Sequence, residues 1–135
     1  MNTIYLTEKD YLRLVDLIQA QRAKGPLDNN VRTLAEELKR ANRVLPEQIL
    51  DTVVTMNSKV VLEELKTGQE RELTIVYPRD ADITTMKISV LAPVGTAILG
   101  CKVGDMVEWP VPSGTAKYVV KKIVYQPEAA GDFHL

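Results

Sequence analysis

The fold is organised around the stretch Ala92-Pro93-Val94-Gly95-Thr96-Ala97-Ile98-Leu99-Gly100-Cys101-Lys102-Val103-Gly104-Asp105. Pro93 suits the first position of a helix, where a missing N–H costs no hydrogen bond. Gly100 can adopt the left-handed conformation that ends a helix. Gly104-Asp105 is typical of a tight turn. The stretch therefore predicts a short helix that begins at Pro93 and buries Ala97, Ile98 and Leu99.

Extended segments surround this short helix on both sides. Residues 86–91 lead into it and residues 106–109 lead out of it. Further β-branched, apolar or alternating runs occupy residues 52–54, 59–62, 70–77 and 117–125. We therefore expect a sheet whose apolar face the short helix covers.

The first fifty residues have a helical pattern instead. Apolar residues recur at helical spacing from about Glu8 to Ala23, and Thr7 is a good N-cap for that helix. Lys24-Gly25-Pro26 breaks it. A second apolar stripe (Val31, Leu34, Leu38 and Ala41) predicts a helix capped by Asp28, Asn29 or Asn30. Two such helices joined by a short turn form an antiparallel hairpin, which we expect to project about 25 Å.

The change of pattern near residue 50 divides the chain into two predicted domains, residues 1–50 and residues 51–135. All seven glycines except Gly25 lie in the second part. The predicted fold class is thus α+β, with a short N-terminal helical hairpin, or coiled coil, followed by a sheet domain with one packed helix.

Composition excludes several classes of function. The 135 residues carry a formal net charge of −1, which gives no general electrostatic basis for binding nucleic acid. No apolar run reaches the roughly 18 residues of a membrane span, and the chain start lacks the basic and apolar regions of a signal peptide. A single cysteine cannot form an internal disulfide. We therefore expect a cytoplasmic protein that does not bind a membrane.

Candidate catalytic groups are few. The only histidine, His134, is one residue from the C-terminal end of the sequence, which argues against a catalytic Ser/His/Asp triad or Cys/His pair. With one histidine and one cysteine, the sequence also has no spacing of zinc ligands. Cys101 is interpreted as a small apolar residue in a turn, although Lys102 beside it could activate its thiol. Asp28 either caps the second helix or acts as a functional acid at the hairpin tip. The residues alone predict a binding module with no catalytic site, metal or cofactor.

The central stretch resembles the C-terminal domain of the bacterial Gre transcript-cleavage factors. Their pattern of a strand, Ser-Pro-hydrophobic-Gly-x-Ala-hydrophobic-Leu-Gly and Val-Gly-Asp is matched here by residues 92–100 and 103–105. Residues 61–68 and 73–76 are also Gre-like, so the resemblance covers roughly residues 53–125. Within that family the chain is similar to a shorter branch, the Rnk-type regulators of nucleoside diphosphate kinase, in residues 51–58, Ala92-Pro93-Val94-Gly95 and residues 125–132.

This resemblance implies an antiparallel sheet domain like that of the FK506-binding proteins, and binding of RNA polymerase at the rim of its secondary channel. It implies a docking surface that includes Leu91, Ala92, Pro93 and Val94. In Gre factors a longer hairpin enters the channel, and acids at its tip help to hold a magnesium ion for RNA cleavage. Here the tip (Gly25, Pro26, Asp28 and Asn29) has a single acid.

We therefore expect a monomeric regulator that competes with Gre-type factors, cleaves no transcript and binds no specific DNA sequence. Two alternatives stay open at this point. One is a Gre-type cleavage factor that uses Asp28, and the other is a prolyl isomerase or peptide-binding module formed by the C-terminal domain alone.

Overall fold

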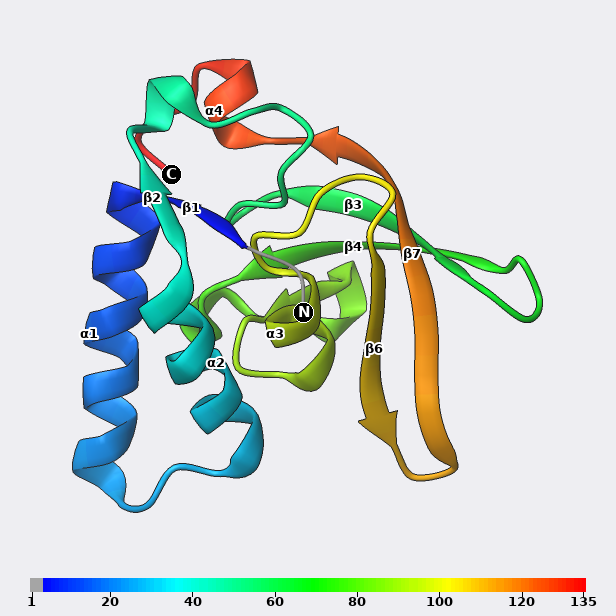
Figure 1. Ribbon diagram of the computed structural model, residues 1–135, viewed down its shortest axis with the longest axis horizontal. Helices are drawn as coiled ribbons and strands as arrows, with labels where there is room; N and C mark the ends of the chain where they lie inside the picture. The colour runs from blue at the N-terminus through cyan, green and yellow to red at the C-terminus, as the bar shows by residue number, and fades with distance from the viewer. Residues whose placement is uncertain (1–3) are drawn as a thin grey trace.

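The computed structural model describes residues 4–135 as a mixed α+β protein, in which N-terminal helices lie against a curled β-sheet (Figure 1). The predicted α+β class is confirmed, whereas residues 1–3 of the chain start considered above lie outside the described residues. The helices are α1 (Glu8–Lys24), α2 (Asn29–Arg40), α3 (Pro93–Ile98) and α4 (Pro127–Ala130), with short 3-10 turns η1 (Pro46–Gln48), η2 (Pro78–Asp80) and η3 (Ile83–Thr85). The strands are β1 (Tyr5–Thr7), β2 (Asn42–Val44), β3 (Lys59–Glu64), β4 (Glu70–Val76), β5 (Lys87–Ser89), β6 (Met106–Val111) and β7 (Gly114–Tyr125). No helix within residues 4–135 has the length and apolar character needed to cross a membrane.

The main sheet has the strand order β5-β4-β3-β7-β6. The pairs β3–β4, β3–β7 and β6–β7 are antiparallel, but β4 and β5 are parallel, with Thr74 opposite Lys87. The expectation of an antiparallel sheet is therefore wrong at this edge. The reason lies in the connection, because residues 77–86 cross over through η2 and η3 and return the chain to a point beside Thr74, from which β5 runs in the same direction as β4.

The central stretch folds as its residues predict. Pro93 is the first residue of α3, and Gly100 follows the helix with φ +77°. Ile98 and Leu99 are fully buried, while Ala97 is half-buried. Gly104 has φ +97° and leads into β6, and the N–H of Lys102 donates to the Asp105 carboxylate (2.9 Å).

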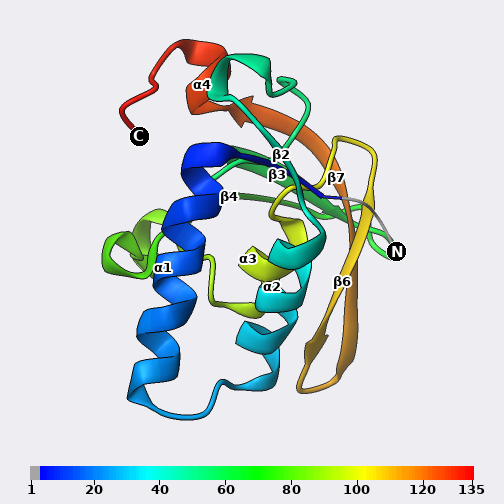
Figure 2. The same cartoon turned by 60° about the vertical axis from the view of Figure 1, so that its left-hand side comes forward.

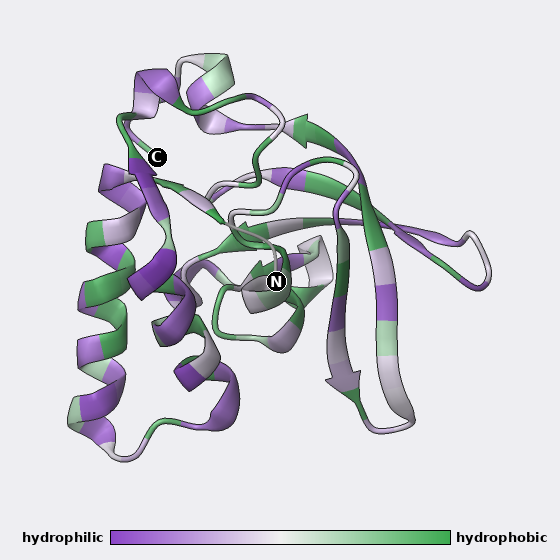
Figure 3. Ribbon diagram, in the orientation of Figure 1, coloured by the Kyte–Doolittle hydropathy of each residue, from purple (hydrophilic) through white to green (hydrophobic). Residues whose placement is uncertain are grey.

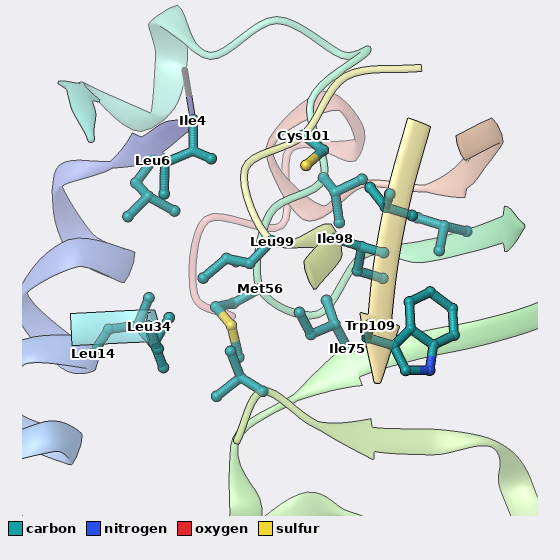
Figure 4. Close-up of a cluster of buried hydrophobic side chains, with 14 of the residues drawn as sticks. Ile4, Leu6, Leu14, Leu34, Met56, Ile75, Ile98, Leu99, Cys101 and Trp109 are labelled. Atoms are coloured by element: carbon teal, nitrogen blue, oxygen red, sulfur yellow. The ribbon is translucent and has the colours of Figure 1, made fainter. Parts of the chain in front are cut away.

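The helical hairpin does not stand free of the sheet domain, which corrects the projecting arrangement expected above. In Figure 1, α1 runs down to residues 25–28, and α2 returns between α1 and α3; Figure 2 shows the same hairpin from the side. Hydrophobic and hydrophilic residues alternate along both helices (Figure 3). Their buried residues, such as Leu14 and Leu34, share one core cluster with Met56, Ile75 and Leu99 of the sheet domain (Figure 4). The hairpin is thus held by the same apolar burial that stabilises the sheet.

A second, small sheet joins the two ends of the hairpin. Strand β1 pairs with β2 in parallel, with Tyr5 opposite Asn42. The N–H of Tyr5 also donates to the carbonyl of Gly100 (3.2 Å), and the N–H of Gly100 donates to the carbonyl of Val54 (2.8 Å). Gly100 therefore lies where the N-terminal strand, the α3 turn and the segment before β3 meet.

Substitution at Gly100 tests this convergence. A Cβ there would lie 2.7 Å from Ile4 Cβ and 3.1 Å from the Tyr5 carbonyl oxygen, whereas a Cβ at Gly68 (φ +72°) would meet nothing within 4 Å. Both positions are left-handed, so alanine at either costs about 1–2 kcal/mol of backbone strain. We expect Gly100→Ala to lose roughly a further 1–3 kcal/mol of unfolding free energy from overpacking, measured by urea denaturation. Equal losses in the two variants would show that the close approach contributes nothing.

Candidate interaction site

The segment that leads into α3 holds the four predicted docking residues. Ala92 is the N-cap of α3, and its N–H donates to the Ser89 carbonyl (3.0 Å). The N–H of Leu91 donates to Ser89 Oγ (3.0 Å). Leu91, Ala92 and Val94 are half-buried, and Pro93 is exposed. These hydrogen bonds tie the segment to the end of β5, with Pro93 exposed at the start of α3.

Asn30, in the first turn of α2, connects the hairpin to this segment. Its Nδ2 donates to the Leu91 carbonyl and to Thr96 Oγ1 (3.0 Å). Thr96 Oγ1 in turn donates to the Val90 carbonyl (2.8 Å). The sequence argument considered Asn30 only as a possible cap. Its spacing to Leu34 and Leu38 was the available signal, because residues four apart share one helix face and this face is the buried one.

The hairpin tip is built around the start of α2. Asp28 is the N-cap, and its Oδ1 accepts from the Val31 N–H (2.8 Å), which decides among the three caps considered above. Gly25 has φ +145°, and its N–H donates to the Arg22 carbonyl (3.2 Å). Asn29 begins the helix and accepts from the Arg32 guanidinium. Pro26, Asp28 and Asn29 are exposed. Since Asn30 is the next residue, the structure brings one end of the tip beside the docking segment.

A cleft of about 330 Å³ opens beside Pro93, between α2, α3 and β6. Its wall is largely apolar, and it includes Met106, which is 65% exposed, and Pro110. Glu37 and Glu108 also line it, and Glu37 forms an ion pair with Arg40 (2.9 Å). Among the described residues that line the cleft there is no Lys or Arg. The cleft thus offers an apolar surface with acidic groups beside it.

Cys101 was considered above as a thiol that the neighbouring Lys102 could activate. Cys101 is buried, its thiol donates to the Ala97 carbonyl (3.3 Å), and burial raises the pKa of the thiol to about 12. It therefore stays protonated at neutral pH and fits the interpretation as a small apolar residue. Within residues 4–135, no three His, Cys, Asp or Glu side chains lie close enough together to hold a metal ion.

Asp10 is a buried charged residue that the sequence analysis did not single out. It is 1% exposed, and its Oδ2 accepts from the Met56 N–H (3.1 Å) while Oδ1 faces the Tyr77 hydroxyl (3.5 Å). Burial, and then the negative charge of Glu128, raises the pKa of Asp10 to about 6, while the Met56 N–H and the Arg13 guanidinium oppose this rise. Asp10 shares the buried face of α1 with Leu14 and Ile18, which was the signal for its burial.

Two protein-family models match this chain, one in each of its two parts. The model of the GreA/GreB C-terminal domain of transcription elongation factors matches residues 49–125, and the Rnk N-terminus model matches residues 2–44. The chain belongs to the Rnk-type branch of the GreA/GreB family. It is 41% identical to the regulator of nucleoside diphosphate kinase of Escherichia coli K12, over 98% of this chain and 97% of that protein.

Two further relatives place this Rnk-type chain within the wider family. It is 35% identical to the transcription elongation factor GreA of Alkaliphilus oremlandii over 105 residues, which are 78% of this chain and 66% of that protein. Its fold matches a solved GreA/GreB factor from Nitrosomonas europaea with a TM-score of 0.78 and 39% identity, covering 93% of this chain and all of that one. These matches confirm the resemblance of residues 92–105 to the GreA/GreB family of transcription elongation factors.

The raised pKa of Asp10 predicts a specific pH dependence of stability. An acid whose pKa is higher in the folded state binds its proton more tightly there, so this residue adds stability as pH falls from about 6 to about 4. At neutral pH its ionised form costs roughly 2–3 kcal/mol. Asp10→Asn keeps an acceptor for the Met56 N–H, so we expect it to stabilise the protein at pH 7.5 and to gain much less at pH 5.

The measurement is urea denaturation of Asp10→Asn and wild type at both pH values. Asp16→Asn, on an exposed position of the same helix, is the matched control and should show no such pH-dependent difference. A stability gain from Asp10→Asn that is equal at pH 5 and pH 7.5 would contradict the raised pKa.

Proposed function

We propose that this protein binds bacterial RNA polymerase at the rim of the secondary channel and competes there with Gre-type factors, without stimulating transcript cleavage. The carrying observation is the exposed Pro93 at the start of α3, in a domain of the GreA/GreB family. In this proposal the protein acts as a monomer in the cytoplasm, where the polymerase is, and needs no cofactor and no specific DNA contact. Any effect on nucleoside diphosphate kinase, as in the name of the Escherichia coli relative, would be indirect.

The docking surface in this proposal is the segment Leu91, Ala92, Pro93 and Val94 together with the adjoining cleft. Pro93 is exposed at the start of α3, and the exposed Met106 lies across the cleft from α3. Apolar groups that are already ordered lose little conformational entropy on binding, which favours their use at an interface. Glu108 favours a partner surface with a basic side chain beside an apolar one, whereas Glu37 is already paired with Arg40 (2.9 Å). The sheet domain, FK506-binding-protein-like in this proposal, thus serves as a docking platform.

The hairpin supports occupancy of the channel entrance rather than chemistry inside it. Helix α1 has 17 residues, which is about 25 Å, and α2 lies against α3 instead of extending beyond the domain. The tip has one carboxylate, Asp28, and one of its oxygens already caps α2. Holding a second metal ion for phosphodiester hydrolysis uses several acidic oxygens aimed at one point. The proposal therefore assigns Asp28 a structural role.

Competition for polymerase tests the partner and the surface together. Labelled Gre factor is bound to core RNA polymerase, and this protein is titrated in. We expect displacement by the wild type, and displacement weakened by about tenfold for Pro93→Ala, since removal of a central interface contact costs about 1–2 kcal/mol. Pro112→Ala, in the exposed turn between β6 and β7, is the control and should compete like wild type. Failure of the wild type to displace the Gre factor would reject the partner, and full competition by Pro93→Ala would reject this surface.

Cleavage of RNA in stalled transcription complexes distinguishes the regulator from a cleavage factor. We expect no stimulation above the polymerase alone. Asp28→Ser removes the carboxylate but keeps a good N-cap, whereas Asp28→Ala loses the cap and about 1 kcal/mol of stability. Stimulated cleavage that disappears in Asp28→Ser would establish the alternative, in which the tip acid takes part in catalysis.

A further inference from the structure

A groove of about 560 Å³ runs between α1 and the segment that follows β4. In Figure 2 that segment stands beside α1, on the side opposite to α2. The α1 wall presents Arg13, Leu17, Ala20 and Lys24, whose spacing of three or four residues places them on one face of the helix. The other wall is the run from Tyr77 to Arg79. None of these residues belongs to the proposed docking segment, so the groove is a separate surface.

The charge around this groove is opposite in sign to that of the whole chain. Three of its residues, Arg13, Lys24 and Arg79, are cationic and only Asp16 is acidic, whereas the full chain has a net charge of −1. In the part of the chain that the structure describes, neither Arg13 nor Lys24 has a carboxylate oxygen within ion-pair distance. Arg79 reaches Asp80 only at 3.8 Å and is 85% exposed. Lys24 and Arg79 therefore remain available to an anion from outside the chain, whereas Arg13 also interacts with Tyr77 and with the buried Asp10 carboxyl.

The end of the groove at Tyr77 is the more rigid one. The Arg13 guanidinium lies 5.9 Å from the centre of the Tyr77 ring, a cation–π geometry that positions it. The Tyr77 hydroxyl in turn faces the buried Asp10 carboxyl (3.5 Å), and burial raises the pKa of Tyr77, so its hydroxyl stays protonated. Arg13 therefore lies against an aromatic side chain that is held by the protein, and Arg79, two residues further along the chain, lines the same groove.

Beyond this cationic end the groove becomes apolar. Leu17 and Ala20 on α1 face it together with Pro78 on the opposite wall, and Gln21 adds a neutral hydrogen-bonding group. Lys24 lies about 16 Å along the helix from Arg13, too far to share one phosphate with it. The groove therefore has Arg13 and Arg79 as possible phosphate ligands and apolar side chains along a wall that is open to solvent.

We propose that this groove binds an organic phosphate with a flat ring, of which a nucleoside diphosphate is the representative probe. The phosphate groups accept hydrogen bonds from Arg13 and Arg79, since the guanidinium fork matches phosphate oxygens. The ring lies on Leu17, Ala20 and Pro78. This site goes beyond the polymerase-binding function and does not depend on it.

The test is calorimetric titration of the full-length protein with adenosine diphosphate at low ionic strength, together with adenosine and inorganic pyrophosphate as separate ligands. We expect the diphosphate to bind more tightly than either part alone, and higher salt to weaken it. Arg13→Gln should weaken binding by about tenfold or more, the effect of removing one charge-assisted hydrogen-bond donor. Arg22→Gln, on an exposed position of the same helix outside the groove, should bind like wild type.

A second pair of variants separates the groove from general electrostatics. Ala20→Glu places a carboxylate in the groove and should abolish binding, while Ala23→Glu places the same charge on an exposed position of α1 outside it and should not. Circular dichroism and thermal unfolding check that each variant is folded. The proposal is overturned if adenosine diphosphate does not bind at millimolar concentration or if Ala23→Glu weakens binding as much as Ala20→Glu. If pyrophosphate binds as tightly as adenosine diphosphate, the proposed recognition of the ring is wrong. If adenosine binds as tightly as adenosine diphosphate, the proposed recognition of the phosphate groups is wrong.

Discussion

The structure depends on the close approach of backbone segments around the two ends of α3. At its N-terminal half, a Cβ on Gly95 would lie 2.4 Å from the Ser89 carbonyl oxygen, so only glycine allows α3 to pack so closely on the chain that enters it. At the other end, the Gly100 carbonyl accepts a hydrogen bond from the Tyr5 N–H, and the Gly100 N–H donates to the Val54 carbonyl. A helix of six residues has little stability of its own, so these contacts hold it in place. The position of α3 in turn decides where α2 and the Pro93 segment lie.

Two polar side chains then fix the hairpin on this platform. Asp10 and Asn30 each begin the buried stripe of their helix, followed at four-residue spacing by Leu14 and Ile18 in α1 and by Leu34 and Leu38 in α2. Apolar contact alone is tolerant of sliding, whereas a buried polar group requires a particular partner. Asp10 finds the Met56 N–H, and Asn30 finds the Leu91 carbonyl. The hairpin and the sheet domain therefore present one continuous surface with a defined register.

Local chemistry explains which parts of this arrangement the sequence could predict. The start of α3 at Pro93, the left-handed Gly100 and the Thr7 cap each depend on one or two neighbouring residues, and the structure has all three. The parallel pairing of β5 and the docking of the hairpin depend on contacts between residues far apart in the chain, which local patterns do not contain. The candidate site shows the same limit. Pro93 and Asp28 could be recognised from the motif and the turn in which they lie. The hydrogen bond from Asn30 to the Leu91 carbonyl could not, because it joins residues that are far apart in the chain. Polar residues on an apolar stripe are the signal that could have revealed it.

The packing of the hairpin against the sheet domain also limits how far the hairpin could reach in the proposed function. A hairpin held along the sheet domain by Asp10, Asn30 and a shared core cannot extend without exposing Leu14 and Leu34, which are fully buried. Exposing two such side chains costs about 1.5–3 kcal/mol each, and breaking the buried polar contacts adds to this. A long reach into a channel is therefore energetically opposed by the packing that makes this short chain stable. In the proposed function, the docking surface therefore combines the GreA/GreB-type sheet domain with the helices that pack on it.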